Sequence, residues 1–272
     1  MDKISLAGDL GSGKSTVAKI LIEALGAEYY TTGGIVRGMA EKMGMGIKEF
    51  NLYMETHPEI DKEIDDGLVA LADDPRPYII DSRMAWHFTK GTFSVYLTTE
   101  LETAAARIWN AKRPCERSSS LEETVACTRA RRESEKKRYY EQYGVDITDL
   151  MNYSLVVDTT VATPEEVAGV ILSAFEKWKK DKSSRFCYLS PERLGYIDDE
   201  RDSELISSLS ERLECCEEIP EVTVFEKNGT FYVESGVESA LAYAFNFFTY
   251  VPARLIKGDV GGRKYVNMKN SL

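Results

Sequence analysis

The chain has 272 residues, of which 43% are hydrophobic and 29% charged, a composition typical of a globular protein with one large or two modest domains. Its formal net charge of −11 argues against a general nucleic-acid binder, because such proteins usually present a basic surface. No apolar run approaches the roughly 20 residues that span a membrane, and five cysteines without metal-ligand spacing predict reduced thiols in a cytoplasmic protein.

A glycine-rich loop follows the first predicted strand. The apolar run Ile4–Gly8 predicts that strand, and Lys14–Leu25 predicts an amphipathic helix directly after the loop. The stretch GDLGSGKST matches the pattern G-x-x-x-x-G-K-S/T at every fixed position, and its backbone N–H groups and helix N-terminus favour phosphate oxygens. The residues predicted to hold the phosphates of a nucleoside triphosphate are Gly8, Asp9, Leu10, Gly11, Ser12, Gly13, Lys14, Ser15 and Thr16.

Three side chains have expected roles in the chemistry of this site. Lys14 is expected to reach the β- and γ-phosphates, and the Ser15 hydroxyl is expected to ligate Mg²⁺. Asp81 ends the apolar segment Tyr78–Ser82, where a carboxylate acting on the water shell of the metal would lie. A turn or helix-cap aspartate is an equal alternative for Asp81. Because cleavage of a signal peptide would remove the loop, we expect no such peptide.

Strand-like and helix-like segments alternate along the first 180 residues. Three further apolar segments predict strands, at Glu28–Thr32, Phe93–Thr98 and Ser154–Thr159. Thr163 followed by Pro164 predicts the start of a helix, since proline is favoured at the first helical position after a threonine cap. This alternation predicts an α/β fold, with a parallel sheet covered by helices on both faces.

Several arginines are placed where they would face the phosphate loop. Arg37 follows the second predicted strand and Arg83 the third, and the carboxyl ends of parallel strands form the ligand crevice of open α/β sheets. Further along, Arg107, Arg113 and Arg117 lie around a proline-broken turn in the stretch RIWNAKRPCERSSS. Guanidinium groups at these points suit phosphoryl transfer, because its catalysis consists mostly of positioning and charge stabilisation.

A charged helix in the stretch RRESEKKRYY carries three residues on one face. Arg131, Glu135 and Arg138 lie at positions i, i+4 and i+7. In isolation, such a face is typical of a solvated helix with intrahelical ion pairs. Together with the other arginines, it suits the binding of two sets of phosphates, since arginine is the side chain best matched to bidentate phosphate contact.

Residues 1 to about 175 resemble a nucleoside monophosphate kinase, most closely the short cytidylate kinases of the archaeal type. The similarity rests on three separated segments in the order of the family: TTGGIVRGMAEKMGMGIKEFNLYMETHPEIDKEID, DSRMAW and RRESEKKRYYEQYGVDITDLMNYSLVVDTT. The resemblance implies a three-layer αβα P-loop nucleotide kinase with a five-stranded parallel sheet. It also implies Mg²⁺-dependent transfer of the γ-phosphate of ATP to a nucleoside monophosphate, with CMP or dCMP as the first candidates.

The resemblance also implies roles for particular residues. Those implied for the base and phosphate of the acceptor are Thr32, Arg37, Arg83 and Glu135, of which Glu135 orients its neighbours or the cytosine. Those implied for catalysis are Lys14, Arg113, Arg117, Arg131 and Arg138. The chain departs from the family pattern at Gly34, in place of an acidic residue, and at Ser82, in place of glycine. Two alternatives stay open: a kinase of a non-nucleotide small metabolite, and a nucleotide-sensing regulator that acts through the C-terminal part.

The pattern changes after the basic stretch KWKKDKSS, which predicts a linker between a domain at 1–180 and a small α+β domain at 185–272. Asn228-Gly229 predicts a hairpin, Asp199–Leu213 and Val237–Phe248 predict helices, and VPARLI predicts a last strand. The layout is similar to the ParB/sulfiredoxin-like fold, although Val-Glu-Ser stands after Gly236 where active members carry a His-Arg pair.

The charge of this C-terminal part bears on its partners. Residues 185–236 include five basic and thirteen acidic residues, a net charge of −8 that would repel DNA. We expect this degenerate domain to serve in homo-oligomer formation, substrate gating or partner contact, with a purely stabilising appendage as the alternative. The expected partners of the whole chain are small nucleotides, with no DNA and no membrane.

Overall fold

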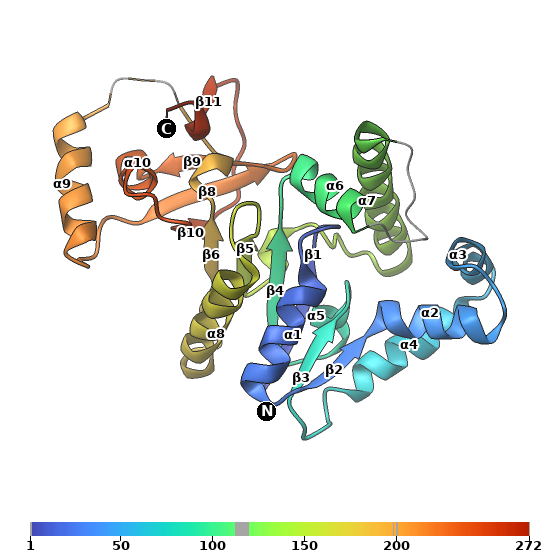
Figure 1. Ribbon diagram of the computed structural model, residues 1–272. Helices are drawn as coiled ribbons and strands as arrows, with labels where there is room; N and C mark the ends of the chain where they lie inside the picture. The colour runs from blue at the N-terminus through green and yellow to red at the C-terminus, as the bar shows by residue number, and fades with distance from the viewer. Residues whose placement is uncertain (1, 112–119, 198, 200, 272) are drawn as a thin grey trace.

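The computed structural model describes residues 2–111, 120–197, 199 and 201–271 (Figure 1). The predicted site residues Arg113 and Arg117 lie outside these ranges. The strands are β1 (Lys3–Gly8), β2 (Glu28–Thr31), β3 (Tyr78–Asp81), β4 (Phe93–Thr98), β5 (Leu155–Asp158), β6 (Phe186–Leu189), β7 (Leu194–Ile197), β8 (Val222–Lys227), β9 (Thr230–Ser235), β10 (Val251–Leu255) and β11 (Tyr265–Asn267). They form one sheet in the order β11-β7-β9-β8-β10-β6-β5-β4-β1-β3-β2.

The helices connect these strands and cover the sheet. They are α1 (Lys14–Leu25), α2 (Thr32–Lys42), α3 (Ile47–Glu55), α4 (Pro58–Ala70), α5 (Ala85–Phe88), α6 (Leu101–Asn110), α7 (Leu121–Tyr143), α8 (Pro164–Lys180), α9 (Ser203–Glu214) and α10 (Val237–Phe245). None of them, within the described residues, is both long enough and apolar enough to cross a bilayer.

The first part of the chain forms a three-layer αβα unit. Strands β5, β4, β1, β3 and β2 are all parallel, and β1 lies at their centre. On one face Ile4 and Leu6 of β1 pack with Val17 of α1 and Phe175 of α8. On the other face α4, α5 and α7 pack over Ile80 and its neighbours. The predicted P-loop kinase fold with a five-stranded parallel sheet is confirmed.

Local sequence signals account for several helix ends. Gly13 and Gly26, both in the left-handed region, flank α1, and the expected bounds of that helix are correct. At α8, Thr163 accepts a hydrogen bond from the backbone N–H of Glu166, whose carboxylate in turn accepts from the backbone N–H of Thr163. The predicted Thr163-Pro164 start is confirmed.

The sheet continues from the first part into the second. Strand β6 pairs in parallel with β5, and β10 pairs antiparallel with β6. One hydrophobic cluster includes Tyr96 and Val156 of the first part together with Val224 and Phe231 of the second. The division between 1–180 and 185–272 stays a prediction, but hydrogen bonding and core packing both cross it.

Some predicted boundaries in the second part are wrong. The hairpin at Asn228-Gly229 is present, with positive φ at both residues. However, VPARLI is not the last strand, because β11 follows, and β7 was not expected. Both of these strands are too short for a clear alternation of apolar and polar residues. Helix α10 ends at Phe245 rather than Phe248, because Phe247 takes a positive φ that breaks the helix.

Candidate active site

The phosphate loop is held tightly between β4 and α6. Gly8, Gly11 and Gly13 all have positive φ angles. A Cβ at Gly8 would lie 2.3 Å from the carbonyl oxygen of Leu97, and one at Gly11 would lie 2.6 Å from that of Ala104. Side chains are therefore excluded at these two glycines, and the loop can present its backbone to a ligand.

The Lys14 side chain folds back onto the loop. Its Nζ donates hydrogen bonds to the carbonyl oxygens of Gly8 (3.0 Å) and Asp9 (2.7 Å) and to the Ser12 hydroxyl (3.4 Å). Burial, and then the nearby Arg83 guanidinium, lower the pKa of Lys14 to about 7. The charge of this ammonium group therefore responds strongly to any anion brought beside it.

The buried carboxylate of Asp9 fixes the loop to its surroundings. It accepts hydrogen bonds from the Tyr96 hydroxyl (2.8 Å), the Thr98 hydroxyl (3.0 Å) and the Thr99 backbone N–H (3.0 Å). It also pairs with Arg132 of α7, at 3.3 Å. With its side chain engaged in this way, Asp9 can meet a phosphate only through its backbone.

Arg83 crosses from the end of β3 to the phosphate loop. Its Nε lies 3.1 Å from the Glu135 carboxylate, and its Nη1 donates to the Gly8 carbonyl oxygen. Arg131 pairs with the other oxygen of Glu135, also at 3.1 Å. Burial raises the pKa of Glu135, but the Arg83 and Arg131 guanidinium groups outweigh it and hold that pKa below its usual range.

The predicted acceptor side is only partly assembled around this pair. Arg83, Glu135 and Arg131 meet at the loop, whereas the Arg138 guanidinium lies over the Tyr139 ring, 5.0 Å from its centroid. The Arg37 side chain is exposed on α2 and makes no hydrogen bond or ion pair with the described residues. Thr32, which was expected to end a strand, is instead the first residue of α2. Its side chain is partly exposed and makes no hydrogen bond with any residue that the structure describes.

The residues predicted to hold a metal lie near the loop. The Ser15 side chain is exposed in the first turn of α1. Asp81 ends β3 as expected, accepts a hydrogen bond from the Tyr29 hydroxyl (3.1 Å), and is among the charges that raise the pKa of Lys14. A hydroxyl and a carboxylate are oxygen ligands that suit Mg²⁺, which usually takes one or two protein oxygens together with phosphate and water.

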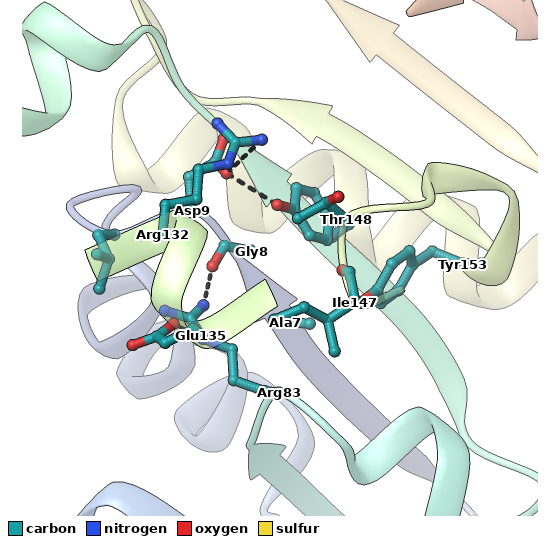
Figure 2. A pocket seen from close by; sticks show the side chains of 11 residues that line it. Ala7, Gly8, Asp9, Arg83, Arg132, Glu135, Ile147, Thr148 and Tyr153 are labelled. Carbon is teal, nitrogen blue, oxygen red and sulfur yellow. Dashed lines mark hydrogen bonds and ion pairs between the residues drawn. The ribbon is translucent and has the colours of Figure 1, made fainter. Parts of the chain in front are cut away.

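A small cavity of about 20 Å³, enough for one water molecule, lies between the loop and α7. Figure 2 shows Arg83 directed at Gly8 and Arg132 directed at Asp9 from the rim of this cavity. Its lining residues are Ala7, Gly8, Asp9, Leu10, Arg83, Tyr96, Arg132, Glu135, Ile147, Thr148 and Tyr153. The two arginines therefore fill the space beside the loop from the side of β3 and α7.

Two arginines near the site were given no individual role from the sequence: Arg132 was missed, and Arg107 was noted only as one of the arginines around the proline-broken turn. Arg132 stands next to Arg131, but successive helical residues point about 100° apart, so the chosen i, i+4, i+7 face left it out. Arg107 of α6 donates to the Thr159 hydroxyl and to the carbonyl oxygens of Thr159 (2.6 Å) and Thr160 (3.2 Å). Each side chain contacts a segment remote in sequence, so its partner could not be predicted. For Arg132, the doubled arginine of RRESE was the available signal.

Comparison with known proteins places this geometry in a family. A family model described as "AAA domain" matches residues 4–137. The chain is 35% identical over 182 residues to the cytidylate kinase of Thermoplasma volcanium, a match covering 65% of this chain and 93% of that protein. The chain belongs to the cytidylate kinase family. It is accordingly a nucleoside monophosphate kinase, and kinases of this kind in general use a nucleoside triphosphate with Mg²⁺.

Two further matches also cover about two thirds of this chain. A protein of Lacinutrix mariniflava named S-adenosylmethionine-dependent nucleotide dehydratase is 38% identical over 176 residues, but the match covers only 36% of that protein. An uncharacterized protein of Eubacterium ventriosum, of solved structure, has a TM-score of 0.51 and 14% identity, covering 65% of this chain and 98% of that one. The latter similarity shows the fold alone. The resemblance of the C-terminal part to a ParB/sulfiredoxin-like domain stays a prediction.

Proposed function

We propose that this nucleoside monophosphate kinase transfers the γ-phosphate of ATP to CMP or dCMP. The observation that carries the proposal is the Arg83–Glu135 pair, which faces the phosphate loop through the contact of Arg83 with Gly8. The identity to a protein named cytidylate kinase supports cytidylate as the acceptor. A non-nucleotide acceptor is not favoured, because the named relatives act on a nucleotide.

The phosphates of ATP would be held by residues 8–16, as the sequence predicts. The Cβ-free backbone of Gly8 and Gly11, the N-terminus of α1 and the Lys14 ammonium fit an anionic group. Mg²⁺ would be held by Ser15 and, through water, by Asp81, and when bound it neutralises part of the triphosphate charge.

The acceptor phosphate would be bound by Arg83 and Arg37, with Thr32 and Glu135 toward the base. Arg83 can exchange the Gly8 carbonyl oxygen for a phosphate oxygen while Glu135 keeps its orientation. The acceptor phosphate is already anionic near neutral pH, so no general base is required. Arg131 and Arg138 of α7, with Arg113 and Arg117 of the predicted lid, would offset repulsion between the two anions and help exclude water.

The proposal includes two statements about the protein as a whole. An ATP-using enzyme whose cysteines are expected to be reduced fits the cytoplasm. We also propose that the C-terminal part provides a contact between copies of the chain or with another partner, rather than binding DNA.

An ADP-release assay across CMP, dCMP, UMP, AMP and GMP tests the acceptor. We expect CMP or dCMP to give the highest kcat/KM. ATP consumption with a non-nucleotide metabolite, and with none of the five monophosphates, would overturn the proposal while leaving the fold unchanged.

A further inference from the structure

A fully buried carboxylate lies at the end of β5, where the two parts of the chain meet. Asp158 is 0% exposed. Its oxygens accept from Arg193 Nη1 (3.0 Å), the Ser190 backbone N–H (3.2 Å) and the Thr160 hydroxyl (2.6 Å). Because a buried charge needs both pairing and hydrogen bonds, this carboxylate depends on Arg193.

Arg193 belongs to the C-terminal part and joins three segments. Besides Asp158, its Nη1 donates to the Thr160 hydroxyl (3.2 Å), and its Nη2 donates to the Gly229 carbonyl oxygen at the tip of the β8–β9 hairpin (2.9 Å). Its guanidinium carbon lies 5.3 Å from the centroid of the Phe231 ring. One side chain therefore ties the hairpin tip to the turn that follows β5.

This turn, residues 158–160, is connected to the phosphate loop through α6. Arg107 of α6 holds the carbonyl oxygens of Thr159 and Thr160. One turn earlier on the same helix, Ala104 lies against Gly11 of the loop. A second path runs through β4, where Thr98 is the strand partner of Asp158 and donates to the Asp9 carboxylate. We call α6 and residues 158–160 the donor side.

The sheet order decides which substrate the donor side meets. Strand β1, which leads into the loop, has β3 with the acceptor arginine Arg83 on one side and β4 followed by β5 on the other. The γ-phosphate must face the acceptor during transfer. The triphosphate is an extended chain held by the loop, so its nucleoside must leave toward β4 and β5.

A second residue of the hairpin, Glu226, interacts by charge with Arg132 of α7. Glu226 of β8 accepts a hydrogen bond from the Gly229 backbone N–H. Burial lowers the pKa of Arg132, but the charges of Asp9 and Glu226 are among those that raise it overall. Arg132 in turn pairs with Asp9 of the loop. The hairpin is thus joined to the donor side through Arg193, and its Glu226 carboxylate interacts by charge with the arginine that pairs with Asp9.

We propose that Arg193 is a positioning residue of the kinase: through Asp158 and Thr160 it holds the 158–160 turn in the conformation that receives the nucleoside of ATP, so that the C-terminal part sets the affinity for ATP. This inference rests on the proposed function in taking ATP as the donor, but it does not depend on which acceptor is used.

Arg193→Lys in the full chain tests this role. Lysine keeps the positive charge, but its single ammonium group cannot donate hydrogen bonds to Asp158 and to Gly229 in the geometry of a guanidinium group. We expect KM for ATP, and the dissociation constant of MgATP measured by calorimetry, to rise roughly tenfold, a typical size for coupling between sites. KM for the acceptor should stay unchanged. The matched control is Arg254→Lys, which alters an exposed pair with Glu221 (2.7 Å) in the same part of the chain.

A second variant distinguishes a local effect on ATP binding from a general loss of stability. Thr160→Val keeps the shape of the side chain and the Arg193–Asp158 pair, but removes the hydroxyl that contacts both. We expect a smaller rise in the ATP constants with the same unchanged acceptor KM. An unchanged MgATP dissociation constant in both variants, or an equal rise in both KM values, would overturn the inference. Because the binding measurement needs no acceptor, failure of the CMP proposal would leave this test intact.

Discussion

Two arginine–carboxylate pairs lie on opposite sides of the phosphate loop and differ in burial. In the Arg83–Glu135 pair both side chains are 19% exposed, and Arg83 also contacts the loop backbone. In the Arg193–Asp158 pair the side chains are 7% and 0% exposed, and neighbouring groups satisfy the remaining hydrogen bonds. An anion from solvent can therefore compete for Arg83 but not for Arg193.

The comparison separates groups that we propose act on substrate from groups that hold the fold. A partly exposed arginine can change partners at little cost, so its loss should alter kinetics more than stability. Removing one partner of a fully buried pair leaves an uncompensated charge, so its loss should alter stability first. Three substitutions and one measurement of proton uptake test this division.

The largest effect is expected at Lys14, on the substrate side of the division. Lys14→Ala should lower kcat by roughly 10³-fold or more, because the ammonium stabilises charge that develops on the phosphates. Circular dichroism and the melting curve should resemble those of the unmodified chain. Lys19→Ala, at an exposed position on the same helix, is the control. Near-normal turnover of the Lys14 variant would contradict the assignment of the loop.

Arg193→Ala should affect stability more than any other single change at the donor side. Leaving Asp158 buried without its partner should lower the free energy of unfolding by about 3–5 kcal/mol, as measured by urea denaturation. Arg254→Ala removes an exposed pair and should cost at most about 1 kcal/mol. Equal losses of unfolding free energy in the two variants would show that the buried pair contributes no more to stability than the surface pair.

Arg83→Ala should show the opposite profile. Loss of a charge-assisted contact should lower kcat/KM for the acceptor by roughly 10²-fold or more, while ATP affinity changes far less. Stability should change little, since Glu135 keeps its pair with Arg131. Arg76→Ala, in an exposed pair with Asp74, serves as the control. Unchanged acceptor kinetics would mean that Arg83 only supports the loop.

The smallest expected effect is the uptake of a proton by Lys14 when ATP binds. The pKa of Lys14 is about 7, well below its ordinary value, and a bound triphosphate would raise it again. At roughly pH 8 the binding of ATP should therefore take up close to one proton, and below about pH 6 this uptake should vanish because Lys14 is already charged. Calorimetry in buffers of different ionisation enthalpy measures it. Proton uptake that persists in Lys14→Ala would assign the proton to another group.

The substrate side of the comparison was the easier half to predict. Gly8, Lys14 and Ser15 belong to one contiguous motif whose spacing alone predicts that they surround a phosphate. Arg83 was found because it follows a strand, and its contact with Glu135, 52 residues away, agrees with their expected placement at one crevice. Arg132 was missed, since only the angle at which α7 lies across the loop selects it.

The sequence by itself determined what depends on neighbours along the chain: the phosphate loop and its helix, the Thr163-Pro164 helix start and the Asn228-Gly229 hairpin. Only the tertiary structure decided that β6 continues the kinase sheet and that Arg193 pairs with Asp158, 35 residues earlier. The physical reason is that a turn or a cap is set by the preferences of a few residues, whereas strand pairing and buried ion pairs arise only when distant segments exclude water from the same space.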